Sequence, residues 1–172
     1  MATQKLIYVI FEQIVASAAI LSGININYQY GDLIEINDNL TKMSSTPKFA
    51  ARKFPLVWLL LPIKGKKSPE NRGVDFECPV SLVIAEYTGK DYKTPERLDK
   101  NFKTKLIPIF EALSEAILNS EDLQFEKHRL EPFDYSDQPF WGRGDKQPFT
   151  DYIDAIFIEN LNIKIKKTIC QL

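Results

Sequence analysis

The chain has 172 residues, of which 44% are hydrophobic and 26% are charged, as in an ordinary globular protein. This length suits one domain spanning residues 1–172. The 22 basic and 23 acidic side chains nearly cancel, which excludes a global charge attraction to nucleic acid or to an anionic membrane. Cys78 and Cys170 do not have the spacing of a metal-binding or redox pair. Two isolated cysteines favour a reducing compartment, and a single disulfide bridge between them is the alternative.

Residues 6–21 are the first predicted element. Their apolar residues recur at helical spacing and Gly23 follows as a left-handed cap, so we expect an amphipathic helix. The segment also has features of a signal peptide, but Glu12 and Gln13 interrupt its apolar run. It is too short and too polar to span a bilayer, so we expect a soluble protein without membrane contact.

The next stretch predicts two short strands and a loop. Residues 24–30 alternate apolar with polar side chains, and Gly31-Asp32 separates them from a short apolar run at 33–36. The two runs can pair as a hairpin. Residues 37–52 have no periodicity, so we expect a long loop, which in a compact domain is usually functional, disordered or ordered by a partner.

Residues 54–63 are apolar on both alternating faces and have a proline near each end, which predicts a central strand covered on both sides. A polar stretch at 64–78 follows, and residues 80–87 again read as a buried strand. We expect these two strands to form an antiparallel hairpin with a long charged tip.

The second half begins with a helix start at Thr94-Pro95-Glu96, with Thr94 as the cap. An apolar stripe then runs to Ile117, and Pro108 inside it should kink or split the helix. We expect a short strand at 123–130, a long loop at 131–149 and a long closing strand. The predicted fold class is α+β: an antiparallel or mixed sheet with the N-terminal helix and the Pro-kinked helix packed on it.

In the closing strand, one predicted face carries apolar residues that alternate with polar ones. That face comprises Phe157, Leu161, Ile163, Ile165 and Ile169. The strand is longer than an ordinary sheet needs, so we expect its end to bend or to reach a neighbouring subunit, with Ile165 and Ile169 at that interface.

The sequence carries no catalytic signature. His128 is the only histidine and lies between two cations, which favours a surface position over a catalytic base. Carboxylate pairs occur at Asp134 with Asp137 and at Asp151 with Asp154, and such pairs leave a small acid–base hydrolase as one alternative. We expect no catalytic residues, no metal site and no cofactor.

Four basic residues cluster in the predicted hairpin tip: Lys64, Lys66, Lys67 and Arg72. A solvated turn that discourages aggregation is the commoner role for such residues. The functional alternative is contact with a nucleic-acid backbone lining a channel. The lysines at positions 164, 166 and 167 carry the same two interpretations.

Aromatic residues gather in the predicted loop 131–149: Phe133, Tyr135, Phe140, Trp141 and Phe149. They can pin the loop to its own domain or form a surface for a partner, because aromatic residues are enriched at interfaces. A protein-interaction module that uses this loop is therefore a further alternative function.

The order of these elements resembles the small tail-terminator and tail-completion proteins of tailed bacteriophages. The resemblance rests on the strand Phe54-Pro55-Leu56-Val57-Trp58-Leu59, the strand Ser81-Leu82-Val83-Ile84 and the helix at 106–118. It implies a non-enzymatic virion protein, assembled in the host cytoplasm, that forms a ring at the head–tail junction. It also implies six or more copies per ring, contacts with other tail or neck proteins, and non-specific DNA contact in the lumen. The loops at 37–52 and 131–149 depart from the family pattern.

Overall fold

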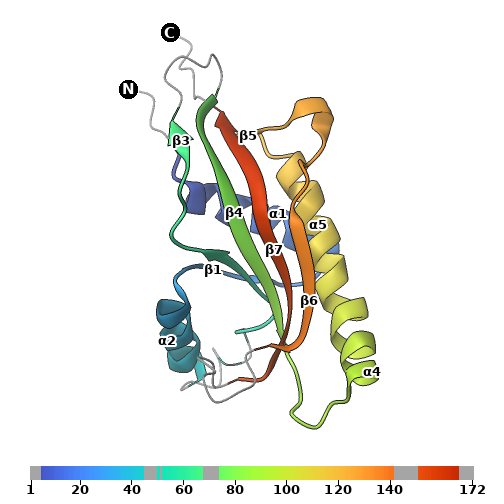
Figure 1. The fold of residues 1–172 in the computed structure, drawn as a ribbon. Coiled ribbons are helices and arrows are strands. Elements are labelled where there is room, and N and C mark those ends of the chain that lie inside the picture. Colours follow the sequence, from blue (N-terminus) through green and yellow to red (C-terminus); the bar gives the residue numbers. More distant parts are fainter. Residues whose placement is uncertain (1–4, 45–49, 51, 68–73, 142–150, 167–172) are drawn as a thin grey trace.

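The computed structural model describes residues 5–44, 50, 52–67, 74–141 and 151–166. Five residues singled out from the sequence lie outside these ranges: Arg72, Phe149, Lys167, Ile169 and Cys170. The chain folds into a mixed sheet with helices packed on it, so the predicted α+β class is confirmed (Figure 1).

The sheet is organised around two long antiparallel strands. Its strands are β1 (Asn27–Gly31), β2 (Leu56–Leu60), β3 (Lys66–Lys67), β4 (Val74–Tyr87), β5 (Leu123–Gln124), β6 (Asp134–Trp141) and β7 (Ile153–Lys166). The order is β1-β2-β4-β7-β5, with β3 beside β4 and β6 beside β7. Figure 1 shows β4 and β7 running side by side through the molecule. The predicted central strand is therefore wrong in detail: β2 lies between β1 and β4, and the β4–β7 pair is the centre.

Helices cover both faces of the sheet unequally. They are α1 (Ile7–Ser22), α2 (Leu33–Ser44), α4 (Thr94–Arg97), the π-helix η1 (Leu98–Leu106), α5 (Ile107–Leu118) and the 3-10 turn η2 (Glu126–His128). The larger hydrophobic cluster lies between one sheet face and α1, η1 and α5. A smaller cluster lies on the other face, where Ile36 and Leu40 of α2 pack near Trp58. The sheet is thus covered by helices along one face and in part along the other.

Several predicted elements are confirmed. Helix α1 occupies the predicted segment and ends at Gly23, whose φ of 68° is left-handed. Strands β2 and β4 pair antiparallel, with Trp58 opposite Val83. Both faces of β2 are buried, because Val57 contributes to the larger cluster and Trp58 to the smaller one. The predicted helix cap is displaced by one residue: the cap is Lys93, whose backbone N–H donates to Glu96.

The helical stretch 94–118 changes its geometry just before Pro108. The π-helix η1 ends at Leu106, and the backbone N–H of Ile107 donates to the carbonyl of Phe102, five residues earlier. Helix α5 then continues with Pro108 as its second residue, directly after the wider π-winding of η1. The chain therefore accommodates the proline by a local change of winding.

The predicted hairpin of residues 24–30 with 33–36 is wrong, because β1 pairs in parallel with β2 and residues 33–44 form α2. Asp32 starts this helix by accepting hydrogen bonds from the backbone N–H groups of Ile34 and Glu35, each at 2.9 Å. Ile36 and Leu40 lie four residues apart and are both buried. The loop predicted to start at residue 37 is also wrong, because residues 37–44 belong to α2.

The long loop predicted at 131–149 is also wrong in part, because β6 occupies residues 134–141 and pairs with β7. The strand predicted at 123–130 is limited to β5, since the η2 turn follows and Lys127 has a positive φ of 55°. His128 in this turn is exposed, as expected.

Strand β7 is long, as predicted, over Ile153–Lys166, but its faces differ from the predicted ones. Between the pairs Val80–Leu161 and Leu82–Ile158 it has one residue more than β4, and Asn160 has a left-handed φ of 58°. This bulge reverses the alternation. Phe157 therefore lies with the smaller cluster, whereas Leu161 lies with the larger one.

Candidate functional site

Lysines that are far apart in the sequence meet on one face of the sheet. Across β3, β4 and β7 the register aligns Lys66 with Glu77 and Glu77 with Lys164, and Lys166 lies two residues further along β7. Residues aligned across neighbouring strands point to the same side of the sheet. Lys64, Lys66, Lys164 and Lys166 are called the lysine face below.

The lysine face lies on the same side of the sheet as the smaller hydrophobic cluster, because Glu77 alternates along β4 in step with Val83 and Ala85 of that cluster. Lys64, Lys66 and Lys166 are exposed, and none of them forms an ion pair with another residue of the described ranges. A shallow depression lies between Lys64, Lys66 and Asn162, with Pro79 at its floor. Lys67 does not belong to the lysine face. It lies opposite Phe76 in the strand register, so it points to the helix-covered side of the sheet, although it too is exposed.

Lys164 is held by acidic neighbours. Its Nζ lies 3.2 Å from Glu131 and 3.8 Å from Glu126. Asn162 donates to Glu77 at 2.9 Å and to Glu131 at 3.0 Å. The hydrogen bond with Glu131 raises the pKa of Lys164, and the hydrogen bonds from Asn162 and Lys164 lower the pKa of Glu131. These contacts compensate Lys164 and leave three lysines available to an external anion.

The aromatic residues of the predicted loop contact their own domain. The Phe133 and Tyr135 rings lie 6.3 and 5.1 Å from the ring of Phe110 on α5. Trp141 packs edge-on against Phe157 at 4.6 Å. Of the two open interpretations, these contacts favour pinning.

The aromatic Phe140 and the aliphatic Ile165 also pack within their own domain. The Phe140 ring stacks on Tyr152 at 5.1 Å and lies under the Arg97 guanidinium at 4.1 Å. Ile165, expected at a subunit interface, is only 4% exposed and belongs to the larger core cluster. It therefore offers no surface to a neighbour in this structure.

The two carboxylates of each pair noted in the sequence have different partners. Asp134 accepts from Asn160 at 2.6 Å, whereas Asp137 accepts from the Tyr135 hydroxyl at 2.8 Å. Asp151 forms an ion pair with Lys53, whereas Asp154 is fully buried elsewhere. The described ranges contain no group of three or more histidine, cysteine, aspartate or glutamate side chains that could hold a metal ion.

Sequence reasoning missed a buried polar cluster around Asp154. This carboxylate accepts from the Asn101 amide at 2.7 Å and from the Phe140 backbone N–H at 2.8 Å, and it lies 3.7 Å from Arg97 Nε. Glu86 is its partner across the β4–β7 pair, and desolvation raises the pKa of Glu86 although Lys105 Nζ lies 3.1 Å away. The signal in the sequence is Asp154 itself, which lies inside an apolar strand. A buried carboxylate needs a buried partner to stabilise it.

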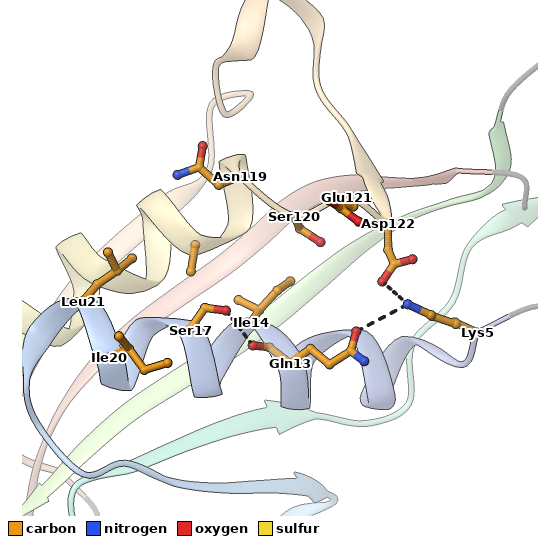
Figure 2. A pocket seen from close by; sticks show the side chains of 11 residues that line it. Lys5, Gln13, Ile14, Ser17, Ile20, Leu21, Asn119, Ser120, Glu121 and Asp122 are labelled. Atoms are coloured by element: carbon orange, nitrogen blue, oxygen red, sulfur yellow. Dashed lines mark hydrogen bonds and ion pairs between the residues drawn. The ribbon is translucent and has the colours of Figure 1, made fainter.

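A separate open groove lies between α1 and the turn after α5 (Figure 2). Ile14, Ser17 and Ile20 line it from α1, and Ser120 with Asp122 lines the opposite side. The Lys5 ammonium closes one end by pairing with Asp122 at 2.8 Å. Lys5 and Asp122 thus compensate each other's charge at this end of the groove.

Comparisons with protein-family models and with curated protein sequences find no match for this chain. Within the described ranges, no helix combines the length and the apolar character needed to cross a bilayer.

Proposed function

We propose that the chain is a non-enzymatic structural subunit of a phage neck or tail, which assembles as a ring of the tail-terminator or tail-completion kind. The observation that carries this proposal is the lysine face. Lysines from β3 and β7 gather on one exposed part of the sheet, and three of them have no described ion-pair partner. A ring that encloses DNA needs such a surface, because phosphate contacts by lysine are sequence-independent.

The aromatic and acidic residues support a structural role over the hydrolase alternative. The carboxylates proposed for acid–base chemistry, Asp134 and Asp137, are each engaged by different partners. A glycosidase-type mechanism needs two carboxyl groups facing each other across a cleft. The interaction-module alternative remains, with a different surface from the one expected.

Oligomeric state tests the ring. We expect native mass spectrometry over a wide concentration range to show one closed oligomer of several copies, because a rotation that closes gives a single stoichiometry. A chain that stays monomeric at every concentration contradicts the ring.

DNA binding tests the lysine face separately. Replacing Lys64, Lys66 and Lys166 with glutamine should weaken binding to double-stranded DNA. The slope of log K against log salt should fall by roughly 0.9 for each lysine that contacts a phosphate. The matched control replaces three lysines that are exposed elsewhere, Lys90, Lys103 and Lys127. An equal slope for both triple variants refutes the lysine face as a DNA contact.

A further inference from the structure

The outer edge of β1 forms the floor of a groove between two helices. The consecutive residues 28–30 line it together with Tyr8 and Glu12 of α1 and with Glu35 and Met43 of α2. Successive strand residues point to opposite faces, so α1 forms the wall on one face of the sheet and α2 the wall on the other. The groove therefore runs along the backbone edge of the strand.

Backbone groups of two tyrosines point into this groove. The N–H of Asn27 donates to the carbonyl of Pro55 at 2.8 Å, and the carbonyl of Gly31 accepts from Leu61 at 3.1 Å, so both residues are turned toward β2. By alternation, the N–H and C=O groups of Tyr28 and Tyr30 are turned away from β2. Since β2 is the strand that pairs with β1 among the described residues, these four groups are available to another strand.

This edge lacks the features that block other edges of the sheet. Strand β6, which pairs only with β7 among the described residues, carries Asp134, Asp137 and Pro139, and β3 consists of two lysines. Charges and proline at an edge prevent pairing with another chain. The sequence of β1, Asn-Tyr-Gln-Tyr-Gly, contains neither. The edge of β1 thus lacks the blocking features that β6 and β3 carry.

The chemistry of the walls defines the segment that fits. On the α1 side, Tyr30 stacks on Tyr8 at 4.6 Å and lies 6.2 Å from Tyr28. The negative charge of Glu12 lies close enough to raise the pKa of Tyr28, although burial is the larger cause. A basic side chain can lie over these rings and pair with the Glu12 carboxylate.

On the α2 side, the Gln29 amide nitrogen contacts the Met43 sulfur at 3.6 Å. The Gln29 Oε1 atom is buried and has no hydrogen-bond partner among the described residues. A buried acceptor without a donor is costly, so a donor from an added strand would stabilise it.

We propose that this groove binds an extended segment of a partner protein as an additional β-strand beside β1, with a basic side chain on the tyrosine side. Backbone hydrogen bonds to Tyr28 and Tyr30 supply affinity, and the contact with Glu12 supplies selectivity. This surface is distinct from the lysine face, and it exists whether or not the chain forms a ring.

The probe is a blocked heptapeptide in which valine and arginine alternate. Amide hydrogen exchange of the full chain, followed by NMR, should show protection of Tyr28 and Tyr30 on addition of the peptide. Exchange at Gln29, whose N–H faces β2, should change little. The matched control peptide has the same sequence with N-methyl groups on the residues that face β1, which removes its donors. It should bind roughly tenfold or more weakly, as loss of one or two backbone hydrogen bonds predicts.

Two variants separate backbone pairing from side-chain contact. Tyr30→Pro removes an outward N–H, and Tyr30→Ala removes the same ring but keeps the N–H. We expect Tyr30→Pro to bind the peptide several-fold more weakly than Tyr30→Ala. Glu12→Gln tests the basic preference without altering the strand, and it should reduce binding of the arginine peptide more than that of a peptide with glutamine in place of arginine.

Three outcomes overturn the proposal. The first is an absence of protection at Tyr28 and Tyr30 at millimolar peptide, and the second is equal binding of the N-methylated peptide. The third is protection of these amides in the free chain that grows with protein concentration, which would assign the edge to a second copy instead. A monomeric chain that binds the peptide would refute the ring and support this groove, so the two proposals fail separately.

Discussion

Replacing Asp154 with alanine is the sharpest test of what stabilises the end of the β4–β7 pair where Asp154 lies opposite Glu86. The carboxylate is fully buried, accepts hydrogen bonds from the Asn101 amide and the Phe140 backbone N–H, and lies 3.7 Å from Arg97 Nε. In Asp154→Ala the Arg97 charge stays buried without its counter-charge. We therefore expect a large loss of stability rather than the loss of one ordinary hydrogen bond.

The magnitude follows from these contacts. Breaking a buried ion pair by removing one partner costs about 3–5 kcal/mol, and each buried donor left unsatisfied costs about 1–3 kcal/mol. These terms overlap, so we expect a loss of about 4–5 kcal/mol in the free energy of unfolding. Since a domain of this size loses about 2–4 °C per kcal/mol, the melting temperature should fall by about 10 °C or more.

Equilibrium unfolding in urea measures this loss, with the m-value as a check that the same surface is exposed. The double variant Asp154→Ala with Arg97→Met removes the unpaired charge as well. It should be less destabilised than the sum of the two single variants, with a coupling of about 1–3 kcal/mol. A loss below about 1 kcal/mol for Asp154→Ala would refute the reasoning, as would strict additivity in the double variant.

Two other predictions concern buried side chains. Trp58→Ala should cost about 3–5 kcal/mol in urea unfolding, because the ring is only 1% exposed and its indole N–H donates to Gly31 at 3.2 Å; a cost below about 1 kcal/mol contradicts this burial. Burial raises the pKa of Glu86 above its ordinary 4.5, so the folded state binds this proton more tightly than the unfolded state. The resulting penalty is absent below pH 4.5 and grows as the pH rises through the folded-state pKa. Glu86→Gln should therefore be more favourable relative to wild type at pH 7 than at pH 4, and a difference that does not change with pH excludes this penalty.

The spacing of apolar residues predicts the helices and strands that bury a whole face in the core. The α1 helix and the β2–β4 hairpin follow from apolar spacing alone, because each must bury a face that the sequence displays. The strand predicted at residues 33–36 is wrong: Leu33, Ile34 and Ile36 suggest a strand, but residues 33–44 form a helix. The deciding interaction is the Asp32 cap, which binds two backbone N–H groups of the first turn. A local hydrogen bond thus outweighed a short apolar pattern.

The candidate sites were less accessible to sequence reasoning than the fold. Lys66 and Lys164 are 98 positions apart and meet only because β3 and β7 both pair with β4. The β1 groove depends on α2, an element that the sequence did not predict. The aromatic residues of β6 stand out in the sequence, but which way each ring points depends on the pairing of β6 with β7. Long-range pairing, which one sequence does not reveal, decided each case.

The bulge at Asn160 shows how one residue controls the lysine face. Ile156 and Ile158 point to the helix-covered side, so uninterrupted alternation would direct Lys164 and Lys166 to that side as well. Burying two ammonium groups under α5 would be prohibitive without partners. The extra residue shifts the alternation, which places Ile163 and Ile165 in the core and the lysines on the same side as Lys66. The left-handed φ of Asn160 is thus a requirement both of the packed core and of the surface through which we propose that this protein contacts DNA.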